Sequence, residues 1–265
     1  MSNNLFSIAD KIIVVTGGLG QLGEQWVGVL ASAGARVAVL DARVGVEGEI
    51  VGLGGGSVLH VRCEVDKGRD VRHALSVIVN TWGEVPDGLV NAAAVDVPPV
   101  NNPLDHQDGS FEHYGEEAWD RMAEINVKGT WLCCRTFGGC MALGGRGSIV
   151  NVGSIYGQLS PDQRVYGGDW TKPLAYTATK SALYGVTRWL ATYWAKVGVR
   201  VNILTPGGVA NDQEAGFVER YCQRVPMGRM ADQSDYDGAL LYLLSDASRY
   251  MTGADLVVDG GLTAW

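Results

Sequence analysis

A tyrosine and a lysine four residues apart are the pair with the clearest chemical meaning. Tyr176 and Lys180 open a long amphipathic run in the order Tyr-Thr-Ala-Thr-Lys. Residues at positions i and i+4 share one face of a helix, so the two side chains are expected to lie together. An ammonium group beside a phenol favours the phenolate and lowers the phenol's pKa from about 10. We therefore predict that Tyr176 exchanges a proton with a reacting hydroxyl or carbonyl group.

Three further features suit the same chemistry. Ser154 follows an apolar run, where its hydroxyl could bond a substrate oxygen. Asn126 lies inside a predicted helix, where an amide is not a favoured core residue. Pro206-Gly207 follows another apolar run, where a rigid turn could form a wall beside a ring. Each is predicted to contribute to one site.

A glycine-rich turn near the amino end has the spacing of a phosphate-binding loop. Residues 16–23 read TGGLGQLG, with Gly17, Gly20 and Gly23 between a predicted strand and a predicted helix. Glycines allow a tight turn and close backbone approach to a pyrophosphate. The start of the following helix supplies unpaired N–H groups and the positive end of a dipole. We predict that this turn binds a dinucleotide.

Asp41 ends the second predicted strand and indicates which dinucleotide. A carboxylate there can accept hydrogen bonds from both adenosine ribose hydroxyls, and it would repel the 2′-phosphate of NADP. NAD is therefore the predicted cofactor. Arg43, two residues later, could accommodate a 2′-phosphate, so NADP use stays open.

The elements that position these residues follow from hydropathy. Short apolar runs predict strands at 11–16, 36–41, 57–62, 88–91, 148–152, 199–204 and 255–258. Longer amphipathic runs predict helices at 21–33, 71–82, 175–196 and 235–245, and two helical segments within 116–142. Such alternation predicts βαβ units, hence a parallel sheet with helices on both faces. With no repeat or linker, residues 1–265 are predicted to form one domain whose ligands bind beyond the carboxyl ends of the strands.

Composition excludes other classes. The net charge of −8 and the lack of clustered Lys and Arg argue against nucleic acid and anionic membranes as partners. No apolar stretch is long enough to span a bilayer, and the amino end has no secretory signal pattern. The five cysteines form no CxxC pair, and the four histidines have no metal-ligand spacing. We predict reduced thiols, a cytoplasmic protein and no metal.

Taken together, these motifs resemble the short-chain dehydrogenase/reductase family. The resemblance rests on TGGLGQLG, Asp41, Asn126, Ser154, the Tyr176/Lys180 pair and Pro206-Gly207. The segments Leu243-Leu244-Ser245-Asp246, Thr252-Gly253 and Val258-Asp259-Gly260-Gly261 are similar to its single-domain branch of about this length, and the likeness runs from Lys11 to Gly261. It implies a Rossmann-like, doubly wound sheet of seven parallel strands, and a homotetramer or homodimer.

The resemblance also implies roles. Tyr176 would be the acid/base, Ser154 would orient the reacting oxygen, and Lys180 would bind the nicotinamide ribose and lower the pKa of Tyr176. Asn126 would hold a water that links Lys180 to solvent. Besides Tyr176 and Lys180, the implied cofactor contacts are Gly17, Leu19, Gly20, Gln21, Leu22, Gly23, Asp41, Glu64, Val65, Asn91, Ala92, Ala93, Pro206, Gly207, Val209 and Asn211.

The sequence departs from the family pattern in five places, of which the largest is the loop between Ser154 and Tyr176, which is longer than usual. The glycine spacing TGxxGxxG is more typical of the longer branch that modifies sugar nucleotides. Ala94 stands where the family usually has glycine, and Cys63-Glu64-Val65 replaces the usual Asp-Val, so Glu64 would have to reach the adenine amino group. Asn211 stands where a threonine usually bonds the nicotinamide carboxamide.

Two polar loops predict the kind of substrate. The loops 96–114 and 160–170 are expected to flank the reacting oxygen, and long ordered loops are commonly functional. They contain Asp96, Asp162, Gln163, Arg164, Tyr166, Asp169 and Trp170, with little aliphatic surface. Asp96, Ser154, Arg164 and Tyr166 are the predicted substrate contacts. Such side chains suit a small polar substrate, a sugar or sugar acid, better than a steroid or acyl chain.

The leading hypothesis is an NAD-dependent oxidoreductase that interconverts a secondary alcohol and a ketone. The glycine spacing leaves open an epimerase or dehydratase that acts on a sugar nucleotide with tightly held NAD. The short segment after Leu204 opposes that reading. A redox-sensing NAD-binding protein without catalysis is the third reading, and the joint presence of Asn126, Ser154, Tyr176 and Lys180 argues against it. Turnover of free NAD with an alcohol panel separates the three.

Overall fold

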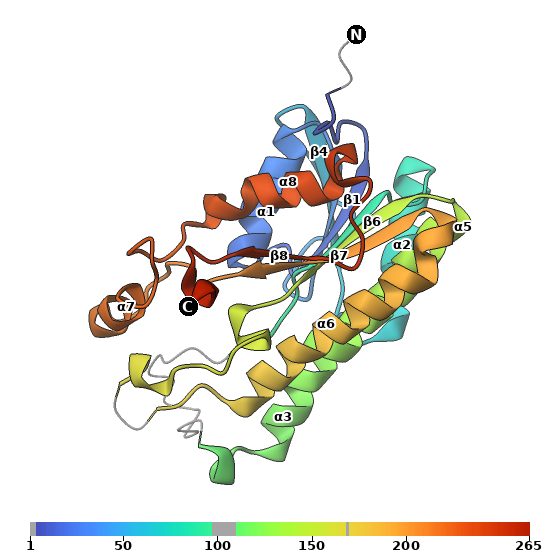
Figure 1. Cartoon of the computed structure of the whole chain (residues 1–265). Helices are drawn as coiled ribbons and strands as arrows, with labels where there is room; N and C mark the ends of the chain where they lie inside the picture. Colours follow the sequence, from blue (N-terminus) through green and yellow to red (C-terminus); the bar gives the residue numbers. More distant parts are fainter. Residues whose placement is uncertain (1–3, 97–109, 168–169) are drawn as a thin grey trace.

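The buried apolar runs form one eight-stranded sheet in the computed structural model, which describes residues 4–96, 110–167 and 170–265 (Figure 1). The strands are β1 (Ile12–Thr16), β2 (Arg36–Asp41), β3 (Ile50–Leu53), β4 (Gly56–Arg62), β5 (Gly88–Asn91), β6 (Gly147–Val152), β7 (Val199–Pro206) and β8 (Asp255–Val258). Their spatial order is β3-β4-β2-β1-β5-β6-β7-β8. All neighbouring pairs are parallel except β3 and β4. The predicted doubly wound Rossmann-like sheet is confirmed.

The antiparallel edge strand β3 was not predicted. Its sequence, Ile-Val-Gly-Leu, is apolar, but the run is only four residues long and contains a glycine, and all four residues are exposed. It pairs with β4 through a tight turn in which Gly54 has a φ of 59°. A side chain at Gly54 would also lie 2.7 Å from the Cα atom of Ser32. The turn therefore needs glycine both for its backbone conformation and for its contact with α1.

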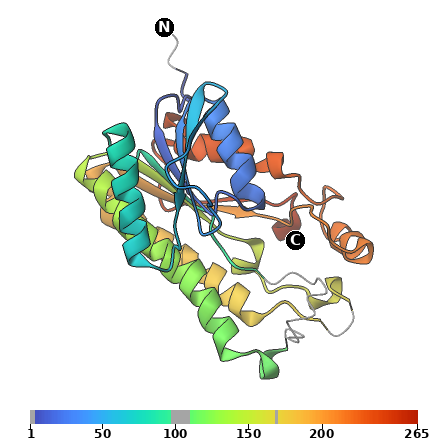
Figure 2. The same cartoon turned by 180° about the vertical axis from the view of Figure 1, so that it is seen from behind.

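Helices cover both faces of the sheet (Figures 1 and 2). They are α1 (Gln21–Ser32), α2 (Gly68–Trp82), α3 (Glu116–Ala123), α4 (Thr130–Cys133), α5 (Gly139–Leu143), α6 (Leu174–Trp194), α7 (Ala215–Cys222) and α8 (Asp237–Leu244). In β1, Ile13 and Val15 face the α1 and α8 side, whereas Ile12 and Val14 face the side of α2 and α6. This alternation is what a strand buried on both faces requires.

The prediction of two separate helical segments within 116–142 is wrong, because they form one continuous helical run. The chain stays helical from Glu116 to Leu143, because π-helical segments at Glu124–Gly129 and Cys134–Gly138 join α3, α4 and α5. Such insertions shift the helical period, so the sequence pattern there looks broken. The short helix α7, beyond β7, was also not predicted.

Candidate active site

The carboxyl end of β6 and the first turn of α6 bring Ser154, Tyr176 and Lys180 together. Ser154 lies two residues after the end of β6, and its hydroxyl accepts a hydrogen bond from the Tyr156 backbone N–H at 3.2 Å. The Ser154 side chain also shares a hydrogen bond with Tyr176. The Lys180 ammonium donates to the carbonyl oxygen of Val152, the last residue of β6, at 2.8 Å. The structure thus places two hydroxyl groups and an ammonium group at one point.

The pKa of Tyr176 runs against expectation. We predicted that Lys180 would lower it, but burial raises it well above its ordinary range, and the charge of Asp96 adds to that effect. The hydrogen bond with Ser154 opposes the rise without cancelling it. The Lys180 nitrogen lies 5.9 Å from the centroid of the tyrosine ring, so its attraction for the phenolate is weaker than the cost of burial.

Lys180 itself is almost completely buried, and burial lowers its pKa to about 8. Asp96 opposes that change, whereas a second ammonium group, that of Lys172, reinforces it. At neutral pH the lysine is therefore still charged, but it titrates within reach of mildly alkaline conditions.

Asn126 binds the segment just after β5. Its side-chain oxygen accepts from the Val95 N–H at 2.7 Å, and its amide nitrogen donates to the Val95 carbonyl at 3.1 Å and to the Thr179 hydroxyl at 3.2 Å. Both N–H groups of the amide are used within the protein, so a water at Asn126 would have to donate to one of its oxygens. The water relay stays a prediction, and the structure adds that Asn126, in its π-helical segment, fixes the chain just after β5.

The glycine turn is built as a dinucleotide loop. A side-chain carbon at Gly17 would lie 2.7 Å from the Cα atom of Ala93, and one at Gly23 would lie 2.1 Å from the Gly17 carbonyl oxygen. Gly20, just before α1, has no side chain to cap the first N–H groups of that helix. The backbone of Gln21, Leu22 and Gly23 therefore offers its N–H groups to an anion.

Asp41 lies beside this turn, but its carboxylate is already engaged. Its two oxygens accept from Arg43, at 2.9 Å from Nε and 3.0 Å from Nη2, and one accepts from the Leu19 N–H at 3.2 Å. Burial of Asp41 raises its pKa, but the hydrogen bonds from Arg43 and Leu19 outweigh burial and keep the pKa below its ordinary value. A ribose would therefore share Asp41 with Arg43 or displace it.

The other predicted cofactor residues near β4 and β5 lie at the same edge. Glu64 and Val65 follow β4, and Val65 packs against Gly129, where a side-chain carbon would come within 2.7 Å. The Thr16 hydroxyl accepts from the N–H groups of Ala92 and Ala93, at 3.2 and 3.1 Å. These bonds hold the segment after β5 against the glycine turn.

The Asn91 side chain lies inside the protein. Its amide nitrogen donates to the side-chain oxygen of Asn151 at 2.8 Å and to the Cys134 sulfur at 3.3 Å. The amide nitrogen of Asn151 donates in turn to the Thr187 hydroxyl. This buried chain of amides ties β5 to β6 and to α6. The amide nitrogen of Asn91 is thus used within the protein, whereas its buried side-chain oxygen has no partner among the described residues.

The loop after β7 contacts the start of α1, next to the glycine turn. Gly207 donates to the Val258 carbonyl, Val209 pairs with Ala231, and the Gln21 side chain donates to the Ala210 carbonyl at 2.7 Å. The Asn211 backbone N–H donates to the Gln213 side chain at 2.7 Å. Pro206, Gly207, Val209 and Asn211 thus lie on the segment that faces the start of α1.

The two predicted substrate loops are described only in part, because residues 97–109 and Asp169 lie outside the described residues. Arg164 does not point to Tyr176: its side chain is 83% exposed and pairs with Asp162 at 2.8 Å. Tyr166 is buried against Trp170 and Phe217, with ring centroids 4.7 and 5.4 Å away. Its hydroxyl shares a hydrogen bond with Tyr156. We withdraw Arg164 as a substrate contact.

Lys172 is the residue at this site that the sequence reasoning missed. Its nitrogen lies 4.3 Å from the centroid of the Tyr176 ring and pairs with Asp96. The Gln163 side chain holds its backbone by accepting from the N–H at 2.8 Å and donating to the carbonyl at 3.4 Å. A lysine four residues before the tyrosine was the only signal, and it lies before α6, where helical spacing does not apply.

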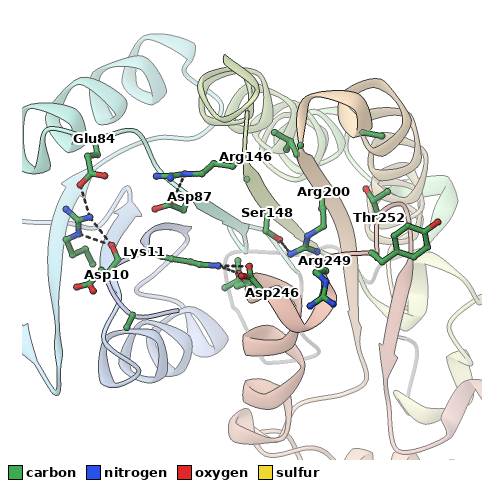
Figure 3. Close-up of a pocket in the computed structure, with 18 residues that line it drawn as sticks. Asp10, Lys11, Glu84, Asp87, Arg146, Ser148, Arg200, Asp246, Arg249 and Thr252 are labelled. Carbon is green, nitrogen blue, oxygen red and sulfur yellow. Dashed lines mark hydrogen bonds and ion pairs between the residues drawn. The ribbon is translucent and has the colours of Figure 1, made fainter. Parts of the chain in front are cut away.

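A cavity of about 940 Å³ lies at the opposite end of the sheet. Figure 3 shows its charged side chains, which come from the amino ends of the strands and largely pair with one another, as Lys11 with Asp246, Arg36 with Glu84 and Arg146 with Asp87. None of the residues proposed for catalysis lines it. Its volume therefore does not make it the candidate active site.

Within 4–96, 110–167 and 170–265, no three His, Cys, Asp or Glu side chains are grouped so that they could hold a metal ion. In the same ranges, no helix has the length and apolar character needed to cross a bilayer.

Comparisons with known proteins agree with this geometry. A family model described as "Enoyl-(Acyl carrier protein) reductase" matches residues 20–263. The chain is 33% identical to the 2,5-dichloro-2,5-cyclohexadiene-1,4-diol dehydrogenase of Sphingobium indicum, over 97% of this chain and 98% of that protein. It is also 33% identical to the D-threitol dehydrogenase of Mycolicibacterium smegmatis, over 97% and 95%.

A solved structure shows the same fold. The short-chain dehydrogenase of Leptospira borgpetersenii with bound NAD+ matches with a TM-score of 0.83 and 29% identity, over 99% of this chain and 96% of that one. The chain belongs to the short-chain dehydrogenase/reductase family, and it is an oxidoreductase of that family.

Proposed function

We propose that this protein is an NAD-dependent dehydrogenase that interconverts a secondary alcohol and a ketone on a small polar substrate, with Tyr176 as the acid/base. The observation that carries the proposal is the meeting of Ser154, Tyr176 and Lys180 at the edge that also holds the glycine turn. Proton exchange and dinucleotide binding are thereby supplied on one side of the sheet, beyond the carboxyl ends of its strands.

The residues present fit a dinucleotide. The backbone N–H groups at the start of α1 suit a pyrophosphate, and the buried carboxylate of Asp41 suits the ribose hydroxyls. Glu64, Val65 and the backbone from Asn91 to Ala93 would border the adenosine. The segment from Pro206 to Asn211 would border the nicotinamide. When bound, NAD supplies the acceptor for a hydride from the substrate carbon.

The side chains of the protein then transfer the proton that accompanies the hydride. In oxidation Tyr176 takes the proton from the substrate hydroxyl, and in reduction it returns one to the carbonyl oxygen. Ser154 holds that same oxygen by a hydrogen bond. The charge on Lys180 stabilises the tyrosinate, which accepts the substrate proton in oxidation and is left behind when Tyr176 donates its proton in reduction, because opposite charges favour the ionised phenol.

Polar surroundings and the relatives support a substrate with several hydroxyls. Asp96, Lys172 and the hydroxyls of Tyr156 and Tyr166 lie close enough to interact with Tyr176 or with each other. Two relatives carry the names of a diol dehydrogenase and a threitol dehydrogenase. We infer a diol, polyol or sugar-like substrate for this chain.

The test is turnover of NAD with a panel of polyols, sugars, hydroxy acids and hydrophobic alcohols. Tyr176→Phe keeps the ring but removes the exchangeable proton, so turnover should fall by about 10²–10⁴. NAD affinity, measured by calorimetry, should survive. Near wild-type turnover in Tyr176→Phe would remove this mechanism. A wild type that binds NAD but oxidises nothing would favour a sensor, and one active only on sugar nucleotides would favour the epimerase or dehydratase reading.

We also propose that the protein acts in the cytoplasm as a homodimer or homotetramer. The five cysteines are all free thiols in the structure, which suits a reducing compartment. On α6, the exposed rings of Trp189 and Tyr193 stack with their centroids 4.8 Å apart. Paired exposed aromatic rings are typical of protein interfaces.

A further inference from the structure

The Lys172–Asp96 ion pair stands at the catalytic tyrosine but has no task in the proton exchange proposed above. Lys172 belongs to the loop before α6, and Asp96 follows β5, 76 positions earlier in the chain. The lysine side chain is only 5% exposed, whereas that of Asp96 is 45% exposed. The pair therefore has a buried ammonium group against Tyr176 and a carboxylate that solvent, or a substrate, can reach.

Side-chain amides fix the backbone at or next to both members of the pair. Asn126 binds the backbone of Val95 on both its N–H and its carbonyl, so the neighbouring Asp96 starts from a fixed point. Gln163 binds the backbone of Lys172 in the same two-sided way. Fixed polar groups beside the reacting atoms are what recognition of a substrate requires, since little ordering remains to be done when it binds.

We propose that the Lys172–Asp96 pair is a specificity determinant that recognises a second hydroxyl group, next to the carbon that reacts at Tyr176. This inference rests on the dehydrogenase function proposed above. The ammonium lies over the face of the Tyr176 ring, 4.3 Å from its centroid, so a substrate oxygen bound by Tyr176 and Ser154 places its neighbouring carbon within reach of the pair. A hydroxyl can donate to the carboxylate and accept from the ammonium, which uses both members at once.

The charges favour a hydroxyl over a carboxylate at this position. The two members neutralise each other, so an anionic substrate group would have to break the pair and would be repelled by Asp96. Lys180 adds a positive charge nearby, but its ammonium is bound to the Val152 carbonyl. A neutral diol or polyol therefore fits better than the sugar acid that the sequence left open.

We expect the enzyme to prefer a diol over the matching alcohol with one hydroxyl by a moderate factor. A site whose polar groups are left unpaired rejects an analogue without the hydroxyl by several orders of magnitude. Here Lys172 and Asp96 satisfy each other when the second hydroxyl is missing, so less is lost. We expect the wild type to prefer butane-2,3-diol over butan-2-ol by about 10- to 100-fold in kcat/KM, about 1.4 to 2.7 kcal/mol.

The experiment compares these two alcohols, which differ by one hydroxyl, in the wild type and in Lys172→Met. The variant should lose most of its preference: kcat/KM for the diol should fall about tenfold or more, and that for butan-2-ol should change little. NAD affinity should stay the same. Arg164→Ala is the matched control, because it removes a cation from the same loop that points to solvent. Its kinetics should equal those of the wild type.

Asp96→Asn gives a second, opposite readout, and serves if Lys172→Met does not fold. It leaves a hydrogen-bonding amide but removes the negative charge beside Lys172, so activity on 3-hydroxybutanoate should rise relative to the diol. A merely structural pair would not change the charge preference of the enzyme. The proposal is overturned if the wild type does not prefer the diol, if Lys172→Met slows both alcohols equally, or if Asp96→Asn leaves the acid-to-diol ratio unchanged.

These outcomes would overturn the specificity proposal alone. Failure of the proposed dehydrogenase function would instead show as no NAD turnover with any alcohol, or as full activity in Tyr176→Phe.

Discussion

The side chains of Tyr176, Lys172 and Lys180 lie close together, and burial shifts the pKa values of Tyr176 and Lys180. Tyr176 sits between Lys180, one helical turn later, and Lys172, which covers its ring. Burial raises the pKa of the tyrosine and lowers that of Lys180. Without cofactor or substrate, the site therefore holds a neutral phenol, and alcohol oxidation should speed up with pH as the tyrosinate becomes populated.

Lys180 makes the folded protein less stable at neutral pH. Its pKa falls from 10.5 to about 8 on folding, so the unfolded chain binds more protons between these values. The free energy of unfolding then rises with pH from about 8 to about 10.5 on account of this group, and the cost of the buried charge is fully present below pH 8. Lys180→Met should stabilise the cofactor-free protein at pH 7 by about 1–3 kcal/mol.

Urea denaturation of both proteins across this pH range checks that prediction. The advantage of Lys180→Met should shrink as pH rises and should be lost near pH 10.5. A constant difference between the two proteins, or a variant that is less stable at pH 7, would show that the hydrogen bond to Val152 outweighs the buried charge. Catalytic activity should be lost in either case.

We predict that Asp41 and Arg43 together set the cofactor preference. With Asp41 at the ribose, NAD should exceed NADP in kcat/KM by at least about tenfold, or about 1.4 kcal/mol. Asp41→Ser should narrow that gap, because it removes the repulsion and frees Arg43 for a 2′-phosphate. Arg43→Ala should tighten NAD binding, because the ribose no longer competes for the carboxylate.

Calorimetric titration with both cofactors, together with steady-state kinetics, measures these changes. Equal use of NAD and NADP by the wild type would contradict the assignment of Asp41. Weaker NAD binding in Arg43→Ala would mean that the arginine holds the cofactor and not only the carboxylate.

At the scale of elements, the glycine turn and α1 form one packed unit. Gly23 and Gly28 both lie in α1, but only Gly23 touches the turn: a side-chain carbon there would lie 2.1 Å from the Gly17 oxygen, whereas Gly28 has nothing within 4 Å. Gly23→Ala should therefore push the turn out of place, weaken NAD binding at least tenfold and cost about 1–3 kcal/mol of stability. Gly28→Ala should instead add about 0.5–1 kcal/mol, because alanine favours the helix.

Thermal unfolding and NAD titration of the two variants give the comparison. If Gly23→Ala binds NAD as the wild type does, the turn tolerates a side chain and its glycine spacing has another cause. If Gly28→Ala is destabilising, unseen packing at that position would explain it.

The elements also show which parts of the molecule could be predicted from sequence. The seven parallel strands were predictable because each is a buried apolar run, and Tyr176, Lys180 and Ser154 were predictable because adjacent strand ends and one helical turn bring them together. Strand β3 is also apolar in sequence, but it is a four-residue run with a glycine in it, and its residues are exposed. The Lys172–Asp96 contact joins two loops far apart in sequence, and the exposed position of Arg164 depends on its local pair with Asp162. Neither follows from periodicity.

On the scale of the whole molecule, the two ends of the sheet differ in character. The carboxyl ends of the strands hold the glycine turn, Asp41 and the catalytic side chains, whereas the amino ends line a cavity of ion pairs (Figure 3). Helix α6 runs along the outside of the molecule beside α3, and it links the catalytic end to the outer surface (Figure 1). Whatever packs on α6 therefore packs on the helix that carries Tyr176.

The outer face of α6 is where we expect copies of the chain to meet. Trp189 is 61% and Tyr193 is 64% exposed, and their stacked rings form an apolar surface that a partner would remove from water. A twofold interface places the same residues of both copies together, so one charge introduced in the chain appears twice at the contact. Trp189→Glu should therefore split the assembly.

Light scattering after size-exclusion chromatography measures the outcome. The wild type should have a mass that is a multiple of 28.3 kDa, and Trp189→Glu should shift toward 28.3 kDa with an unchanged circular dichroism spectrum. Tyr250→Glu is the control, because Tyr250 is a fully exposed aromatic residue that lines the cavity at the amino end of the sheet and is not part of α6. It should leave the mass unchanged. A wild type of 28.3 kDa would contradict the assembly, and an intact oligomer of Trp189→Glu would place the interface on another face.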